Sequence, residues 1–301
     1  MPSVSSSSPA LDAAYAYCAD LVRKQDRDRF LATLFVPEEM RRHLLALYAF
    51  NIDVARVREV VREPLPGEVR LAWWREVIEG QGRGAVEGHP VALSLLDTMA
   101  RFSLPASALT NLVDARIFDL YDDPMPSLAD LEGYAGETAS VLMQLSLLVL
   151  APDMATLAGD VAGHGGVALA MTGLMRSFPV HARRGQCYVP LDMLARHGMG
   201  REDAVSGKVS AGLLATLSDL REAASGHLAR ANTAFMALPK EGRLRLAAPL
   251  LPLILVPGDL RALAKVVDPF RDMAGLSVFW RQFALWSAAR RIKAGGGLVR
   301  T

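Results

Sequence analysis

The sequence predicts an all-α protein that folds as one helical domain, and three observations lead to this prediction. Apolar residues recur at steps of three and four along almost the whole chain, which is the spacing of one face of an α-helix. No stretch shows the strict alternation that is typical of a half-buried strand. No linker-like segment divides the middle of the chain. We therefore expect a disordered leader over residues 1–11, one helical domain over 12–293 and a flexible tail over 294–301.

The predicted helices follow one another closely. Pro37 and the two acids after it predict a helix start, and the apolar stripe that follows predicts one long helix ending at Pro64. Ser127 and Asp130 resemble a capping box that opens a helix continuing through the apolar run 141–150. Further helices are predicted over 165–178, which Pro179 ends, from 191, and over 211–238, 257–267 and 273–292.

Composition limits the classes of function. The chain of 301 residues is 51% hydrophobic, and its 33 Lys and Arg against 32 Asp and Glu leave a net charge of +1. This balance argues against a dedicated nucleic-acid binder. The two cysteines are far apart and favour a reducing compartment. The start of the sequence has no secretory pattern, and the longest apolar run is too short to cross a bilayer. We expect a cytoplasmic protein and leave peripheral membrane contact open.

Three segments, taken in order, resemble the squalene/phytoene synthase family. Residues 47–59 read LYAFNIDVARVRE, residues 131–140 read LEGYAGETAS, and residues 168–181 read ALAMTGLMRSFPVH before RRGQCYVP at 183–190. The resemblance extends from about residue 14 to residue 190. It implies an isoprenoid-synthase-type helical bundle around a central cavity. In active members of the family, it further implies a Mg²⁺-dependent head-to-head condensation of prenyl diphosphates.

The resemblance also places the family's metal-binding acids on this chain. They fall at Ala55, Glu59, Ser177 and His181, so one carboxylate remains of four. Mg²⁺ prefers oxygen ligands, and carboxylates four residues apart share one helix face. Arg56 stands where the family has another acid, and its charge would repel a divalent cation. The resemblance therefore implies a degenerate active site, with no catalytic residue, metal or cofactor assigned.

Other residues are candidates to line the inherited cavity. Arg176, on an otherwise apolar helix, could bind an anionic group, and a structural role is equally open. His181 has no second histidine or cysteine three or four residues away, which favours a polar lining residue over a metal ligand. The complete set of cavity candidates is Tyr48, Asn51, Glu59, Tyr134, Thr138, Thr172, Arg176, His181 and Tyr188.

Two smaller interpretations complete the site prediction. The acid pairs Glu59/Glu63 and Asp119/Asp123 have the right spacing for a metal, but they do not fall at the family's metal positions and are interpreted as ordinary surface pairs. Trp73 and Trp280 are expected in the core, and partner contact is a minor alternative for Trp74.

Within the superfamily, the sequence resembles most the non-synthase branch that contains the mitochondrial complex I assembly factor and its bacterial relatives. The segments that end at Glu59 and His181 carry this resemblance. It implies a role in respiratory-complex assembly, with a respiratory-complex subunit or assembly protein as partner. One alternative is an active prenyltransferase that uses farnesyl or geranylgeranyl diphosphate with Mg²⁺. The other is a protein that binds an isoprenoid lipid. Whether the chain is an enzyme stays open at this point.

Overall fold

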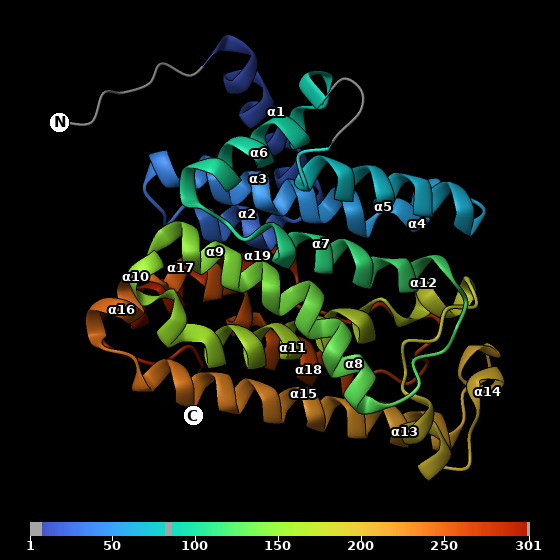
Figure 1. Cartoon of the computed structure of the whole chain (residues 1–301). Helices are drawn as coiled ribbons and strands as arrows, with labels where there is room; N and C mark the ends of the chain where they lie inside the picture. Colours follow the sequence, from blue (N-terminus) through green and yellow to red (C-terminus); the bar gives the residue numbers. More distant parts are fainter. Residues whose placement is uncertain (1–7, 82–85, 300–301) are drawn as a thin grey trace. The chain divides into compact units, whose positions relative to one another are not determined.

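The computed structural model describes residues 8–81 and 86–299, and the described residues form helices joined by short loops (Figure 1). No strand occurs among them, which confirms the all-α prediction. Contacts between residues group the chain into two compact units. Unit 1 holds the residues up to 120 together with 148–150, and unit 2 holds 121–147 and the residues from 151 onward. The units are described one at a time, so the prediction of one domain over 12–293 stays a prediction.

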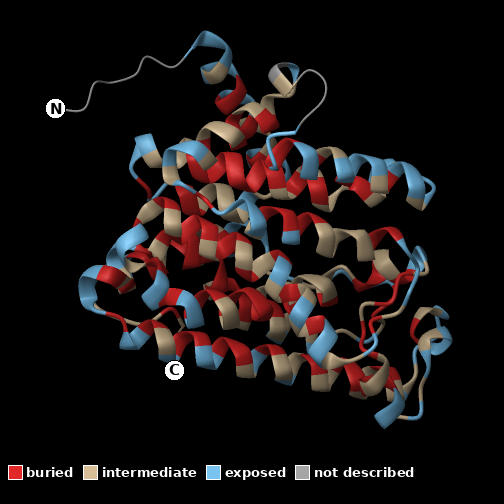
Figure 2. Ribbon diagram, in the orientation of Figure 1, coloured by how far each residue is buried: buried red, intermediate tan, exposed pale blue. Residues whose placement is uncertain are grey.

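In unit 1, α1 packs against α3 and α6, and α5 packs against α7. Most of the buried residues of these helices are apolar, and Figure 2 shows the buried residues in red. The helices of unit 1 are α1 (Pro9–Gln25), α2 (Arg27–Thr33), α3 (Glu38–Ala55), α4 (Val57–Val60), α5 (Pro64–Ile78), α6 (Pro90–Phe102) and α7 (Ala106–Ala115), with the 3-10 turns η1 (Val86–Gly88) and η2 (Arg116–Leu120).

A polar network inside unit 1 joins three of these helices. The Tyr15 hydroxyl, from α1, lies 2.9 Å from Nδ1 of His43 on α3 and 3.2 Å from the Thr98 hydroxyl on α6. It also donates to a carboxylate oxygen of Asp97 at 2.5 Å. Because each buried polar atom has a partner, the network stabilises one arrangement of α1, α3 and α6.

In unit 2, α11 packs against the long α15, against the π-helical turn η3 and against α18. Helix α15 begins where the sequence predicts, because the Ser210 hydroxyl accepts from the Leu213 N–H at 3.1 Å and caps the helix. The elements of unit 2 are α8 (Leu128–Ala135), η3 (Gly136–Ser140), α9 (Val141–Leu150, whose last three residues group with unit 1), α10 (Pro152–Ala155), η4 (Thr156–Ala158), α11 (Gly159–Arg176), α12 (Phe178–Arg183), α13 (Leu191–Arg196), α14 (Arg201–Val205), α15 (Ala211–Ala237), α16 (Lys240–Arg245), α17 (Ala247–Leu250), η5 (Leu251–Leu255), α18 (Val256–Leu263) and α19 (Val278–Lys293).

Two predicted helices differ from the observed ones. The long helix predicted up to Pro64 is interrupted at Arg56, whose φ of −93° and ψ of 3° separate α3 from α4. The last helix was expected from Met273 but begins at Val278. The residues before it stay extended, and the Leu276 N–H donates to Oδ1 of the buried Asp259 at 3.0 Å. This tertiary contact binds a backbone N–H that a longer helix would use internally.

The expected leader and tail are partly outside the described residues. Of the leader, residues 1–7 are not described, and α1 already begins at Pro9 after a Ser8 cap. Of the tail, residues 300–301 are not described. Before them, Leu298 is fully buried, and Asn232 Oδ1 accepts from the Val299 N–H at 3.2 Å. Arg291 Nε also donates to the Gly297 carbonyl at 3.1 Å, so residues 297–299 are bound to α15 and α19.

The tryptophan predictions are wrong for Trp280, which is 57% exposed on α19. Trp74, the candidate for partner contact, is buried and donates its indole N–H to Asp53 at 3.2 Å. Adjacent residues of an α-helix point in directions about 100° apart. The sequence alone could therefore not say which of two adjacent tryptophans faces the core. Among the residues described, no helix combines the length and the apolar character needed to cross a membrane.

Candidate functional site

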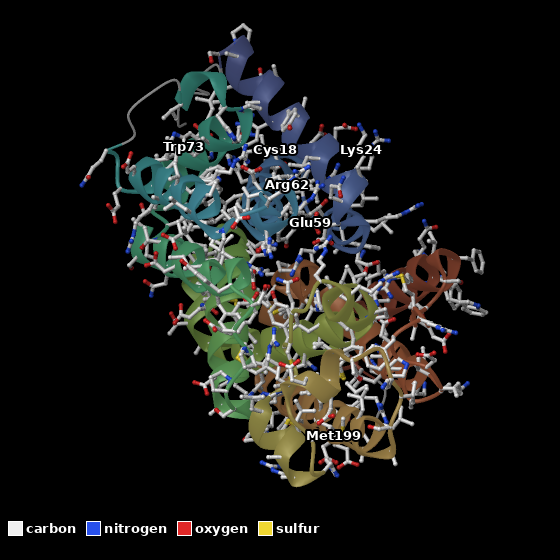
Figure 3. All side chains as sticks on the ribbon, turned by 90° about the vertical axis from the view of Figure 1, so that its right-hand side faces the viewer. Cys18, Lys24, Glu59, Arg62, Trp73 and Met199 are labelled. Carbon is white, nitrogen blue, oxygen red and sulfur yellow. The ribbon has the colours of Figure 1, made fainter. Side chains whose placement is uncertain are left out.

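The first predicted metal segment lies in unit 1, at the junction between α3 and α4. Ala55 is the last residue of α3, and Glu59 is an exposed residue of α4, labelled in Figure 3. Arg56 Nε donates to Oε2 of Glu59 at 2.9 Å. The Glu59 N–H bonds the Arg56 carbonyl, three residues back, so the backbone here is tighter than an α-helix. The Glu59 carboxylate is therefore bound by Arg56.

Two more cavity candidates lie further back on α3. Tyr48 is buried, and the guanidinium of Arg29 lies 5.6 Å from the centre of its ring. Asn51 is half-buried, one turn after Tyr48. Residues 48, 51 and 55 recur at steps of three and four and so follow one side of α3, and Glu59 lies beyond the break at Arg56.

The second predicted metal segment lies in unit 2, at the junction between α11 and α12. Helix α11 ends at Arg176, and Ser177 has φ and ψ of −89° and 1°. Pro179 explains this break, because it has no N–H to donate to the carbonyl of Met175 and its ring crowds that carbonyl. His181 then lies on α12, and its N–H bonds the Ser177 carbonyl at 3.0 Å. Ser177 and His181 are the two residues of this segment at which the sequence analysis expects the family's acids.

Arg176 is turned toward a buried acid. Its Nη1 lies 3.4 Å from Oδ2 of Asp259 on α18, which is 2% exposed. The same carboxylate accepts from Arg281 at 2.8 and 2.9 Å, so one acid is shared by two arginines. The Arg176 Nε has no hydrogen-bond acceptor among the described residues. The arginine that the sequence singled out for an anionic ligand therefore has an ion-pair partner within the protein.

His181 lies in a small aromatic cluster with Tyr188 and Tyr134. The ring centres of His181 and Tyr188 are 4.7 Å apart, and those of Tyr188 and Tyr134 are 6.0 Å apart. Gly185 makes this possible, because its φ of 74° ends α12 and returns the chain toward His181. The bond from the Gln186 N–H to the His181 carbonyl, at 3.0 Å, closes that turn.

Two shallow pockets lie in unit 2, and one of them adjoins the cluster. One holds about 270 Å³ of open space and is lined by His181, Gln186 and Tyr188 together with apolar side chains. The other holds about 370 Å³ and is lined mainly by apolar residues, with Arg221 and Asp272. They share the lining residues Met175, Phe178 and Leu217. Their lining is mainly apolar, with a few polar side chains.

The two threonine candidates donate to the main chain of their own helices. The Thr138 hydroxyl donates to the Tyr134 carbonyl at 2.6 Å and the Thr172 hydroxyl to the Ala168 carbonyl at 2.7 Å. Both side chains are 2% exposed. Thr138 lies in η3, where a serine, Ser140, donates to the Gly163 carbonyl of α11 at 2.8 Å. These hydroxyls serve helix geometry and packing in this structure.

A polar chain that the sequence analysis missed joins three helices of unit 2. Nδ1 of His164 on α11 lies 3.0 Å from Nδ1 of His227 on α15. Nε2 of His227 lies 3.0 Å from Oε1 of Glu132 on α8. Burial, and then the neighbouring His227, lower the pKa of His164. The two histidines are 63 residues apart, so no local spacing could have revealed the pair.

Some of the predicted residues lie together within one unit of the structure. Within unit 2, His181, Tyr188 and Tyr134 are neighbours, while Arg176 turns to Asp259. Tyr48, Asn51 and Glu59 belong to unit 1. Among the described residues, no three His, Cys, Asp or Glu side chains are arranged to bind a metal ion.

Comparison with known proteins places this arrangement in a family. The family model described as squalene/phytoene synthase matches residues 22–280. The "NADH dehydrogenase (ubiquinone) complex I, assembly factor 6" of Rattus norvegicus is 31% identical over 235 residues, which is 78% of this chain and 70% of that protein. Chloroplastic phytoene synthase 2 of Solanum lycopersicum is 26% identical over 211 residues, covering 66% of each.

Solved structures agree on the fold. A dehydrosqualene synthase superposes with a TM-score of 0.73 at 17% identity, over 95% of this chain and 97% of the other. A squalene synthase from Alicyclobacillus acidocaldarius superposes with a TM-score of 0.69 at 20% identity, over 85% and 95%. At these identities the structural likeness speaks for the isoprenoid-synthase fold, and the family follows from the sequence match. This chain belongs to the squalene/phytoene synthase family.

Proposed function

We propose that this chain is a member of the squalene/phytoene synthase family that has lost head-to-head prenyltransferase activity and acts in the assembly of a respiratory complex. One inference supports the first half: the four positions to which the family resemblance assigns the metal ligands hold Ala55, Glu59, Ser177 and His181. The only carboxylate among them is paired with Arg56. Departure of a diphosphate needs its developing charge neutralised by metal ions, and Mg²⁺ needs several oxygen ligands. This donor set does not fit that requirement.

The assembly role rests on the relatives. The assembly factor of Rattus norvegicus is more similar to this chain than is the tomato phytoene synthase, at 31% against 26% identity and over a larger share of the chain. The partner would be a subunit or assembly protein of a respiratory complex. Fold alone cannot supply a partner, so this half of the proposal depends on the sequence relationship.

The catalytic half is tested with the purified protein. Incubation with farnesyl or geranylgeranyl diphosphate and Mg²⁺ or Mn²⁺ should release no diphosphate above a protein-free control, and an active phytoene synthase run in parallel shows that the assay works. Metal-dependent turnover would overturn this half and favour the prenyltransferase. Saturable binding without metal and without release would favour an isoprenoid lipid carrier, the second candidate.

The assembly half is tested in the source organism. Deleting the gene should lower the amount of intact respiratory complex on native gels, and the wild-type gene should restore it. The double variant Ser177→Ala/His181→Ala should restore it equally, because the proposal gives these residues no catalytic step. An unchanged level of every respiratory complex in the deletion strain contradicts the assembly role.

A further inference from the structure

Helix α19 exposes a row of four aromatic side chains, called here the aromatic strip. Phe279, Trp280, Phe283 and Trp286 are 69, 57, 49 and 48% exposed. The centres of successive rings are 5.8, 5.9 and 6.1 Å apart, so the four rings form one continuous surface. Burying a large apolar side chain is worth about 1.5–3 kcal/mol. A contiguous exposed apolar surface of this kind therefore marks a contact site rather than scattered surface residues.

The opposite side of α19 is anchored in unit 2, which fixes the direction of the strip. Leu285, Ala288 and Ile292 are buried, and the helix packs against η5. Arg281 is 9% exposed and donates from Nη1 to both oxygens of the buried Asp259, at 2.8 and 2.9 Å. A rotation of α19 that buried the strip would break this ion pair inside the protein. The aromatic face is thus held outward by the fold.

Positive charge continues the strip toward the end of the helix. Arg290 and Lys293 are exposed and follow Trp286 at steps of four and three, on the same face. The guanidinium of Arg290 lies 4.8 Å from the Trp286 ring. From Met273 to the last residue the sequence has no Asp or Glu. It has five cationic residues there: Arg281, Arg290, Arg291, Lys293 and Arg300. The net charge of the whole chain is +1, so an excess of acidic residues in the rest of the protein nearly balances the cations of this segment.

We propose that the aromatic strip, with Arg290 and Lys293, binds the surface of an anionic lipid bilayer, with α19 lying in the plane of the interface. Tryptophan and phenylalanine side chains partition into the boundary between headgroups and acyl chains, and adjacent Lys and Arg side chains bind lipid phosphates. Each such cation contributes about 1 kcal/mol at an anionic surface. The inference does not depend on the proposed function, because it uses only α19 and its neighbours.

Two other occupants fit less well. A second copy of the chain would bring its own strip, which has the same cations and no acid, so Arg290 and Lys293 would lose water without gaining a counter-charge. A protein partner would need a groove whose shape matches four aromatic side chains with different exposed fractions. A bilayer surface needs no such shape and supplies the negative charge.

The test is co-sedimentation of the full-length protein with phosphatidylcholine vesicles that contain or lack phosphatidylglycerol. The wild type should bind the anionic vesicles at about 0.1 M salt and weaken at about 1 M salt, where the Debye length falls from about 10 Å to about 3 Å. Phe279→Ser/Phe283→Ser/Trp286→Ser should weaken binding by about tenfold or more, because three apolar side chains no longer enter the interface. Leu157→Ser/Val267→Ser, at two exposed apolar side chains elsewhere in unit 2, is the matched control and should bind like the wild type.

A charge variant and an optical signal separate lipid binding from simple stickiness. Arg290→Gln/Lys293→Gln should lose most of the preference for anionic vesicles, and Lys208→Gln/Lys240→Gln, at exposed lysines elsewhere, should keep it. Wild-type tryptophan fluorescence should shift to the blue on vesicles, and Trp280→Phe/Trp286→Phe should bind while losing that shift. Circular dichroism and the thermal midpoint verify the fold of each variant.

Two outcomes would overturn the proposal. One is a wild type that stays in the supernatant with every vesicle composition. If sizing then shows a concentration-dependent dimer that the triple serine variant abolishes, the strip binds a second copy; a monomer without vesicle binding points to a protein partner. The second outcome that would overturn the proposal is that the triple serine variant binds vesicles as well as the wild type does.

Discussion

Helices α3 and α11 have the same length and the same kind of ending, but different anchors. Each has 18 residues and ends where the family's metal-binding segment begins, at a junction with φ near −90° and ψ near 0°. Pro179 accounts for the break after α11. After α3 no proline is near, and the exposed Arg56–Glu59 pair bridges the break. Helix α3 is anchored by the polar network of Tyr15 and His43, and α11 by close backbone packing and the buried Asp259. The comparison teaches that similar backbone breaks can be stabilised by quite different interactions.

The largest expected effect on stability comes from the ion pairs at these junctions, which Asp259 and Glu59 form. Asp259→Asn should lower the free energy of unfolding by about 3–5 kcal/mol, because Arg281 would keep a buried charge without a counter-charge. Glu59→Gln, at the exposed pair of the other junction, should lower it by no more than about 0.5 kcal/mol. Denaturant unfolding measures both. Equal losses of unfolding free energy in the two variants would contradict the expectation that the buried ion pair contributes more to stability than the exposed one.

The second prediction concerns the packing of α11 against η3. A Cβ added at Gly166 would lie 2.4 Å from the Cα and 2.5 Å from the backbone N of Ser140, so the two backbones would have to separate. Gly166→Ala should therefore cost about 2–3 kcal/mol of stability. Gly163→Ala is the control: nothing lies within 4 Å of a Cβ there, and replacing a helical glycine should stabilise by about 0.5–1 kcal/mol. A Gly166→Ala protein as stable as its control would show that α11 is not anchored this way.

The third prediction concerns the anchor of α3 and its response to pH. Burial, and then the nearby Arg42, lower the pKa of His43 to about 4. The unfolded chain binds this proton near pH 6.5, so between about pH 6.5 and about pH 4 it holds a proton that the folded chain does not. The free energy of unfolding should therefore fall by about 2–3 kcal/mol as the pH drops through this range, and the contribution of His43 should level off below about pH 4.

The variant His43→Gln tests whether His43 causes this loss of stability at low pH. It should be less stable at neutral pH, because the bonds to Tyr15 and Thr98 change. It should also show a smaller loss of stability between pH 6.5 and pH 4, which chemical denaturation at several pH values measures. A slope that survives the substitution unchanged would assign the pH dependence to other groups.

The smallest effect is a gain. Ser177→Asp/His181→Asp returns two carboxylates to the α11–α12 segment and should strengthen Mg²⁺-dependent binding of a prenyl diphosphate by about tenfold, or about 1.4 kcal/mol. Ser177→Asn/His181→Asn has similar shapes without the charge and should bind like the wild type. Isothermal titration with and without Mg²⁺ measures the difference. Unchanged affinity of the Asp variant would argue against these two positions as the equivalents of the family's metal ligands.

Many residues of the candidate site could be predicted from local sequence motifs, but the contacts between side chains from different helices could not. The family resemblance named Tyr134, His181 and Tyr188 among the nine cavity candidates, and the rings of these three are neighbours. Nothing in the sequence indicated that Arg176 would turn to Asp259, 83 residues later. The His164–His227 pair was missed for the same reason, since its members come from different helices.

The sequence by itself determined the helical periodicity, the cap at Ser210, the break at Pro179 and the residue types at the four metal positions. These depend on interactions within a few residues, or on side-chain chemistry alone. The tertiary structure decided the break at Arg56, the late start of α19 and the exposure of Trp280. The late start of α19 follows from the bond of the Leu276 N–H to the buried Asp259, and the exposure of Trp280 follows from the Arg281–Asp259 pair that fixes the helix. Such contacts join residues far apart in the chain, and local patterns do not encode them.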